Sequence, residues 1–156
     1  IYQIGALTGF LRAEGMALSH IKPHGALYGM AARQEPIAHA VCDAADVFQV
    51  PILGLKGTLH ESVCAARGHR LVPEFFADLD YADDGALIIT RHHDARDPEA
   101  AARAALRAVT EGLVTGTGGR DVAVGADTIC VHSDTPNAVA VARAVRAALR
   151  PHLTPF

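Results

Sequence analysis

The sequence brings an ammonium, an imidazole and a phenol close together in the stretch Ile21-Lys22-Pro23-His24-Gly25-Ala26-Leu27-Tyr28. This stretch follows an apolar run, 17–21, that predicts a buried strand. Pro23 fixes its own φ and pushes Lys22 into an extended conformation. Gly25 permits a sharp turn and a close approach of the backbone to a ligand. A strand that ends in such a turn is a common way to place functional side chains at the mouth of an α/β sheet.

The scarcity of lysine supports a functional interpretation of this turn. The chain has 14 Lys and Arg residues, and only Lys22 and Lys56 are lysines. Both follow an apolar run, since Lys56 comes directly after 51–55. Lysine and arginine differ in shape and in how their pKa responds to the surroundings. The alternative is a solvated lysine and a histidine held by hydrogen bonds within the turn, and it stays open for Lys22 and His24 taken alone.

The bulk composition excludes several classes of protein. The 156 residues are half hydrophobic and carry a net charge of −3, which gives no basic surface for nucleic acid. No apolar run approaches the ~20 residues of a membrane-spanning helix. The cysteines at 42, 64 and 130 are odd in number and far apart, which predicts buried free thiols in a reducing cytoplasm.

Apolar runs and helical patterns alternate along the chain. Helices are predicted over 1–15, 35–48, 58–67, 98–114 and 136–149, and strands over 17–21, 51–55, 71–77, 86–90 and 126–131. The glycine-rich segment 115–125 is interpreted as a loose connection, because no phosphate-loop Gly-Lys-Ser/Thr follows it. This alternation predicts βαβ units, a parallel sheet and an α/β fold.

Nearly every predicted strand ends in an ionisable group, and in such folds ligands bind at the carboxyl ends of the strands. These groups are Lys22, His24, Lys56, Glu74, Asp78, Arg91, His132 and Asp134. His92 and His93 are adjacent, so in an extended chain they point to opposite sides and do not easily share a metal. They are interpreted as residues of a solvated loop. Asp134-Thr135-Pro136 also fits the N-cap of the last helix, a position that favours a bound anion.

Four blocks of the sequence resemble the LamB/YcsF family. They are Gln3–Leu7, the stretch 21–28, Phe76-Ala77-Asp78 followed by Tyr81 and Gly85, and Asp127–His132 followed by Asp134-Thr135-Pro136. The resemblance implies a seven-stranded β/α barrel of the glycoside hydrolase and deacetylase type. It also implies ATP-dependent opening of the lactam ring of 5-oxoproline to L-glutamate, with this chain as the A component beside the B and C subunits of a 5-oxoprolinase.

The resemblance also implies that 1–156 is the C-terminal portion of one barrel domain. The first helical pattern has no N-cap, and the family's opening segment is not found. Leu79 stands where the family usually has Arg, Ser133 where Gly is usual and Asn137 where Gly is common. The loss of a cation beside Asp78 is the most consequential of these departures.

The residue types fit the implied chemistry. The candidate catalytic residues are Lys22, His24, Glu74, Asp78, His132 and Asp134; the candidate substrate-binding residues are Gly25, Tyr28, Lys56, Arg91 and Thr135. ATP is the implied co-substrate, and no residue is assigned to a metal.

Two alternative functions remain. One is a metal-dependent deacetylase-like hydrolase on the same barrel, which needs an Asp/His/His trio. The other is a non-catalytic scaffold subunit.

Overall fold

The computed structural model describes residues 1–90 and 92–154. The chain divides into two compact units, Ile1–Pro73 and Glu74–Phe156. The fold is mixed α/β with parallel strand pairing, as the sequence predicts. Among the described residues, no helix has the length and apolar character needed to cross a membrane.

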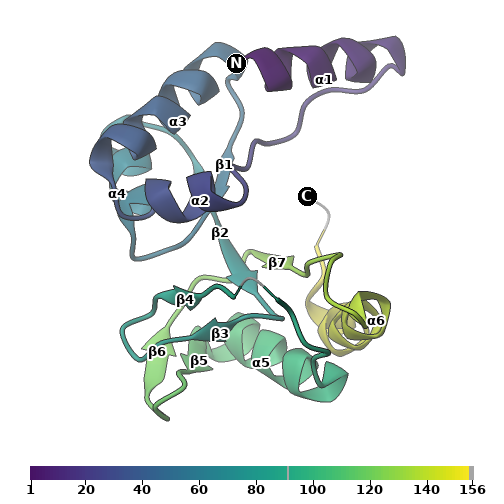
Figure 1. Cartoon of the computed structure of the whole chain (residues 1–156). Coiled ribbons are helices and arrows are strands. Elements are labelled where there is room, and N and C mark those ends of the chain that lie inside the picture. Colours follow the sequence, from purple (N-terminus) through teal and green to yellow (C-terminus); the bar gives the residue numbers. More distant parts are fainter. Residues whose placement is uncertain (91, 155–156) are drawn as a thin grey trace. The chain divides into compact units, whose positions relative to one another are not determined.

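The first unit combines four helices with one parallel strand pair (Figure 1). Its elements are α1 (Tyr2–Ala13), α2 (Ala26–Ala31), α3 (Glu35–Phe48), β1 (Ile52–Gly54), α4 (Leu59–Ala66) and the first half of β2 (Leu71–Phe76). β1 pairs with β2 in parallel, in a register that matches Ile52 with Leu71 and Gly54 with Pro73.

Local signals explain the helices of this unit. α3 has Pro36 in its first turn, where the missing N–H costs nothing, and its C-cap Gln49 adopts a left-handed conformation with φ of 53°. α4 is capped by Thr58, whose side chain accepts a hydrogen bond from the His60 N–H. The core lies where α3, α4 and β1 meet, and it contains Ile21, Ala38, Cys42, Ala45, Ile52, Val63 and Cys64.

Two cysteines lie side by side in this core. The sulfur atoms of Cys42 and Cys64 are 3.9 Å apart, and both residues are buried and free. Burial raises the pKa of both thiols, that of Cys64 to about 12. These two cysteines therefore serve packing, as the sequence predicts, while Cys130 lies in a strand of the second unit at intermediate exposure.

The predicted strand over 17–21 is wrong in extent. Only Ile21 pairs, in a single parallel bridge with Ile52. Its N–H donates to the Pro51 carbonyl at 3.0 Å, and its carbonyl accepts from the Leu53 N–H at 2.9 Å. Pro23 follows almost at once and has no N–H to donate, so the pairing cannot continue.

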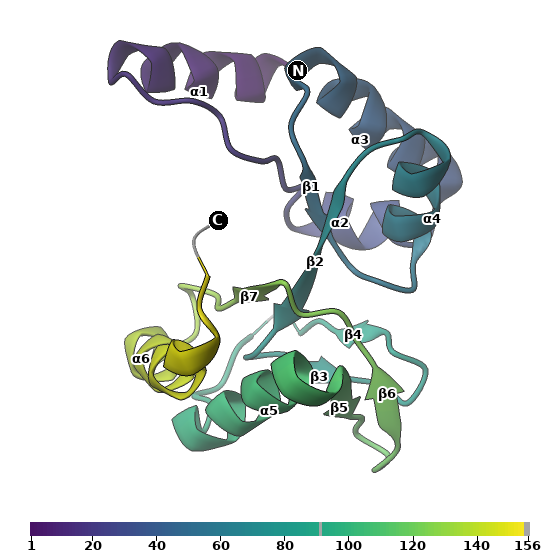
Figure 2. The ribbon, with the colours of Figure 1, turned by 180° about the vertical axis from the view of Figure 1, so that it is seen from behind.

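The second unit contains the second half of β2 with its partner β7, two short antiparallel strand pairs and two packed helices (Figure 2). Its further elements are β3 (Asp80–Tyr81), β4 (Leu87–Ile88), α5 (Pro98–Glu111), β5 (Leu113–Thr115), β6 (Asp121–Ala123), β7 (Thr128–Cys130), α6 (Ala138–Leu149) and the 3-10 helix η1 (Arg150–His152). β2 pairs with β7 in parallel, with Glu74 opposite Thr128 and Phe76 opposite Cys130. α5 packs against α6, and both helices bury apolar side chains.

The predictions for 86–90 and for the glycine-rich segment 115–125 are wrong. The segment 86–90 is not another parallel strand, because β4 pairs antiparallel with β3. The glycine-rich segment is not loose, because β5 and β6 form an antiparallel hairpin across it. Asp83 accepts a hydrogen bond from the Gly118 N–H at 3.0 Å, and a Cβ at Gly118 would clash with the Asp83 carboxylate. The glycine is therefore needed for this close contact.

Candidate functional site

The turn after the Ile21 bridge holds Lys22 close to Tyr28. Pro23 is buried, Lys22 is half-buried and His24 is exposed. Lys22 Nζ lies 5.7 Å from the centroid of the Tyr28 ring, within the range of a cation–π contact. The Tyr28 N–H also donates to the Gly25 carbonyl at 3.2 Å, so the candidate residues of this turn lie close together.

Gly25 permits the chain reversal at this turn. It has φ of 58° and ψ of −139° and serves as the N-cap of α2. A Cβ there would meet nothing within 4 Å, so the backbone conformation rather than space requires glycine. Lys56 lies exposed in the turn that follows β1.

His60 is a buried residue of this unit that sequence reasoning missed. Its ring meets the Tyr28 ring edge-on, and its Nδ1 accepts a hydrogen bond from the Leu55 N–H at 3.0 Å. Burial lowers the pKa of His60 to about 4, and a hydrogen bond with the Tyr28 backbone opposes this shift. The ring is therefore neutral at pH 7, with its proton on Nε2. Nothing in the helical pattern of 58–67 distinguishes this histidine from a surface residue.

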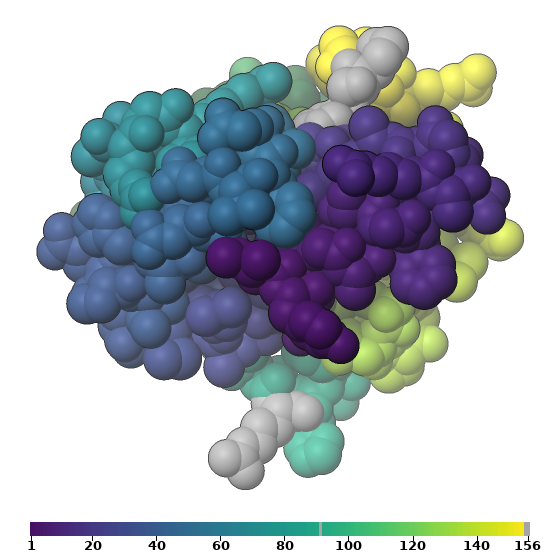
Figure 3. Space-filling view, turned by 90° about the horizontal axis from the view of Figure 1, so that it is seen from above, coloured from purple at the N-terminus to yellow at the C-terminus, as the bar shows by residue number. Residues whose placement is uncertain are grey.

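A cavity of about 640 Å³ opens beside the turn, with mostly apolar walls. Lys22 and His24 supply charged and polar groups to it, and the remaining walls come chiefly from α1 and α3. The space-filling view shows the dark purple start of the chain lying against the blue of α3 (Figure 3). A cavity of this size and lining can hold a small molecule that has an apolar body and an anionic group.

In the second unit, Asp78 and His132 form a tight pair. Asp78 lies two residues past the end of β2 and His132 two residues past the end of β7. Asp78 Oδ2 accepts a hydrogen bond from the His132 backbone N–H at 2.5 Å, and Oδ1 lies 2.9 Å from His132 Nδ1. The Asp78 side chain is 1% exposed and that of His132 is 33% exposed. A buried carboxylate thus orients an imidazole whose Nε2 remains for chemistry.

Two further rings lie parallel to the His132 ring. Phe76 stacks on it with centroids 5.5 Å apart, and His93 with centroids 6.3 Å apart. His93 Nε2 also lies 3.8 Å from Asp134 Oδ2. The interpretation of His92 and His93 as loop residues therefore holds for exposed His92 and misses the contacts of His93.

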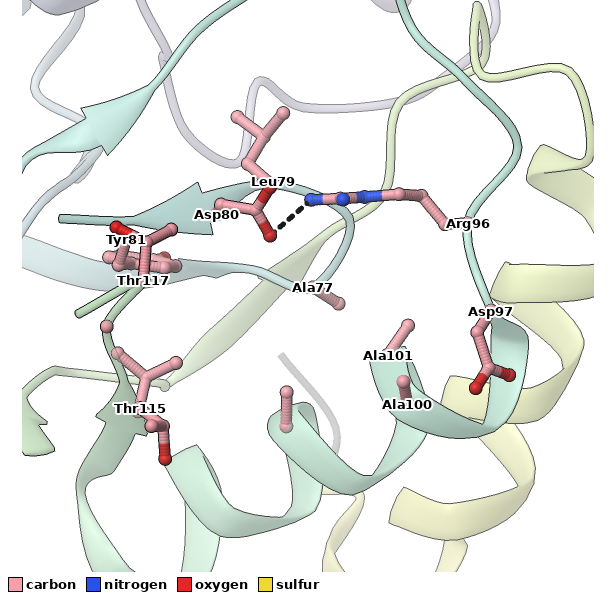
Figure 4. Close-up of a pocket in the computed structure, with 13 residues that line it drawn as sticks. Ala77, Leu79, Asp80, Tyr81, Arg96, Asp97, Ala100, Ala101, Thr115 and Thr117 are labelled. Atoms are coloured by element: carbon pink, nitrogen blue, oxygen red, sulfur yellow. Dashed lines mark ion pairs between the residues drawn. The ribbon is translucent and has the colours of Figure 1, made fainter. Parts of the chain in front are cut away.

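Arg96 supplies a cation next to Asp78, where the sequence has Leu79 in place of the expected arginine. Its Nε donates to the Asp78 carbonyl at 2.7 Å, and one terminal nitrogen lies 2.8 Å from Asp80 Oδ1. Figure 4 shows this pair beside a pocket of about 400 Å³, with Ala100 and Ala101 of α5 in its wall. No local pattern marks Arg96, which is why sequence reasoning missed it.

The remaining candidates of this unit take different positions. Glu74 is buried within β2 rather than at its end. Thr135 is buried and lines a cavity of about 180 Å³ together with Asp78, His93 and Arg96. Asp134 does not cap the last helix, because α6 begins at Ala138 with Asn137 as its N-cap. Arg91 lies outside the described residues.

No three residues of the metal-ligating types gather at one point in the described part of the chain. The groups described above are carboxylates, imidazoles, a lysine ammonium and an arginine guanidinium. Such groups can bind an anion, hold a carbonyl and move protons.

Comparison with known proteins gives consistent matches over nearly the whole chain. The model of the LamB/YcsF family matches residues 1–154. A 5-oxoprolinase A subunit of Thermus thermophilus is 48% identical over 153 residues, which cover 96% of this chain and 61% of the relative. A 5-oxoprolinase A subunit of Pseudomonas putida is 38% identical over 151 residues, covering 96% of this chain and 60% of the relative.

A solved structure agrees with these relatives. The crystal structure of a lactam utilization protein from Thermus thermophilus superposes with a TM-score of 0.83 at 45% sequence identity. The match covers 97% of this chain and 62% of that chain. The chain thus spans about three fifths of the length of the relatives that it matches.

Proposed function

Since the chain belongs to the LamB/YcsF family, we propose that it acts as the A component of a 5-oxoprolinase. The reaction opens the lactam ring of 5-oxoproline to L-glutamate and consumes ATP. Relatives that are named as 5-oxoprolinase A subunits, with 38–48% identity, support the proposal. The structural observation that carries it is the pair formed by buried Asp78 and half-exposed His132.

The ring-opening chemistry needs the groups that this pair supplies. Water adds to the lactam carbonyl, the C–N bond breaks, and the departing nitrogen takes up a proton. ATP activates the carbonyl carbon before this addition, because its terminal phosphoryl group is transferred to the lactam oxygen and ADP is released. Cleavage of the C–N bond then leaves an acyl phosphate, which a second water hydrolyses to the carboxylate and inorganic phosphate. His132 Nε2 takes the proton from the attacking water and returns it to the ring nitrogen, while Asp78 holds Nδ1 and stabilises the imidazolium.

Lys22 supplies the positive charge that this substrate requires. Its ammonium lies near the Tyr28 ring at the edge of the 640 Å³ cavity. We assign it to the carboxylate of 5-oxoproline or to the phosphate formed on the ring oxygen, since a lysine binds either as a point charge. Under this proposal His24, Glu74 and Asp134 assist proton transfer, and Gly25, Tyr28, Lys56, Arg91 and Thr135 contribute to substrate binding.

The proposal extends to the whole protein. The parallel pairs β1–β2 and β2–β7 are compatible with the seven-stranded β/α barrel that the family resemblance implies. The B and C subunits complete the enzyme, and ATP is the co-substrate rather than a resident cofactor.

Reconstitution tests this function. The full-length protein is mixed with its partner subunits, 5-oxoproline and ATP, and the formation of L-glutamate and ADP is measured. We expect both products in equal amounts, and no ADP in excess of background with 2-pyrrolidinone, the same lactam without the carboxylate. Absence of glutamate with 5-oxoproline contradicts the proposal, and turnover of 2-pyrrolidinone contradicts the assignment of a carboxylate site.

A further inference from the structure

Arg96 spans the residues on both sides of Leu79. Its Nε donates to the backbone carbonyl of Asp78 at 2.7 Å. Its terminal nitrogen pairs with Asp80 Oδ1 at 2.8 Å, and Figure 4 shows this ion pair. The planar guanidinium offers donors in fixed directions, so two contacts to neighbouring residues restrict the backbone between them. Asp78 is therefore held at its main chain by Arg96, while its carboxylate holds His132.

The backbone of Arg96 is in turn held by Asn137. The Arg96 N–H donates to Asn137 Oδ1 at 3.0 Å, and Asn137 Nδ2 donates to the Arg96 carbonyl at 2.7 Å. Asn137 occupies the N-cap position of α6, yet its side chain makes no capping hydrogen bond. Its amide is used as both donor and acceptor toward a residue 41 positions away.

From these contacts we propose that Arg96 is a positioning residue for the Asp78–His132 pair, held in place by Asn137. This inference rests on the proposed function in one respect, which is that the Asp78–His132 pair is the reacting centre. The contacts form a chain from the start of α6, through the segment before α5, to Asp78, two residues past the end of β2. A displacement of about 1 Å at a reacting group can cost roughly a hundredfold in rate.

Arg96 and Asn137 should affect the position of the Asp78–His132 pair rather than the free energy of unfolding. The Arg96 and Asp80 side chains are 33% and 54% exposed, and exposed ion pairs contribute little to folding. The Asn137 side chain makes no capping hydrogen bond, so replacing its amide nitrogen removes no cap from α6. Variants at these two positions should therefore separate activity from folding.

The test compares Arg96→Lys and Asn137→Asp with the parent and with Arg103→Ala as the matched control. Arg96→Lys keeps the positive charge but removes the planar set of donors. Asn137→Asp keeps the acceptor for the Arg96 N–H and loses the donor to its carbonyl. Arg103 is an exposed arginine of α5 whose ion pair is 3.9 Å long, and it contacts neither Asp78 nor Asn137 in the described contacts.

The first readout is turnover, measured on the full-length protein with its partner subunits. We expect kcat to fall roughly tenfold or more in Arg96→Lys and several-fold in Asn137→Asp, with KM for 5-oxoproline within about twofold, because positioning acts on the reacting step. Arg103→Ala should match the parent. Equal kcat values in all four proteins overturn the inference.

The second readout does not depend on turnover. The Nδ1–H of His132, donated to buried Asp78, should give a downfield proton signal in NMR spectra that is protected from exchange. We expect this signal to broaden or vanish in Arg96→Lys and Arg96→Ala while the signals of the folded backbone remain. If the parent has the signal but no 5-oxoproline turnover, the proposed function fails and the positioning role is still tested. If the signal persists unchanged in both variants, Arg96 does not position the pair.

Discussion

The imidazole of His60 meets the phenol ring of Tyr28 edge-on, with ring centroids 4.7 Å apart and planes at 74°. Lys22 Nζ lies 5.7 Å from the centroid of the same phenol ring. A buried, neutral histidine thus packs against the aromatic ring that a candidate catalytic lysine contacts. The packing around His60 is therefore a structural support of the turn 21–28, and it leads to two predictions.

Gly54→Ala should destabilise the protein by about 1–3 kcal/mol, because overpacking a buried site forces neighbours to shift. A Cβ at position 54 would lie 2.8 Å from His60 Nδ1 and 3.0 Å from its Cβ and Cγ. Urea unfolding measures the change. Gly5→Ala is the matched control, since nothing lies within 4 Å of a Cβ there and alanine favours the helix by up to ~1 kcal/mol. A Gly54→Ala variant as stable as the parent would show that the His60 side chain can shift without a cost in stability.

Stability should fall on acidification because of His60. Burial lowers its folded-state pKa from 6.5 to about 4, so the unfolded chain binds the proton first. Above pH 6.5 the neutral His60 ring contributes about 3 kcal/mol to the free energy of unfolding. This contribution is lost as the pH falls toward about 4. Denaturation of the parent and of His60→Asn, which keeps an acceptor for the Leu55 N–H, is compared across this range. Identical pH dependence in both proteins would rule out His60 as the cause.

His93 should support activity by packing its ring against His132 rather than by transferring a proton. Its ring lies parallel to that of His132 at 6.3 Å, and an aromatic pair contributes roughly 0.5–1.5 kcal/mol beyond its buried area. We expect His93→Phe to retain 5-oxoproline-dependent ATP hydrolysis within about threefold and His93→Ala to lose about tenfold. Equal losses in the two variants would mean that the imidazole itself takes part in proton transfer.

Lys22→Ala should abolish most turnover and hardly change stability. A lysine that holds developing negative charge in a water-poor site contributes roughly 3–4 kcal/mol to catalysis, or a hundredfold or more in rate. Its contact with Tyr28 contributes about 0.5–1 kcal/mol to folding. Lys22→Arg keeps the charge in a bulkier, planar group and should restore activity only in part. Activity of Lys22→Ala within about twofold of the parent, measured with the partner subunits, would make the turn purely structural.

Much of the fold follows from local signals in the sequence. Glu35–Phe48 is predicted to the residue, because Pro36 marks its start and its apolar face repeats at helical spacing. The strand predicted over 86–90 contains β4, but the two-residue strand β3 gives no such signal, so the antiparallel hairpin that they form is not predicted. The segment 116–119 looks loose because its glycines are visible in the sequence, whereas the Asp83 carboxylate that contacts them lies 35 residues from Gly118.

The site is predictable in its residue types and less so in its contacts. Asp78 and His132 are both expected at strand ends, but they are 54 residues apart, and no periodicity shows that they share two hydrogen bonds. His60, His93 and Arg96 escape sequence reasoning for a common reason. Each carries out its role through a contact with a distant segment, and its own neighbours in the sequence resemble those of a solvated residue.

Replacement of Asp78 by asparagine tests the central claim most directly. The asparagine side chain nearly matches the shape of the aspartate, but it cannot stabilise an imidazolium at His132. In the full-length protein with its partner subunits, we predict that Asp78→Asn lowers kcat for 5-oxoproline-dependent ATP hydrolysis by a factor on the order of 10⁴, as the loss of the orienting carboxylate does in other Asp–His pairs. Asp127→Asn, at an exposed position just before β7, should match the parent. A kcat for Asp78→Asn within about threefold of the parent would contradict the account.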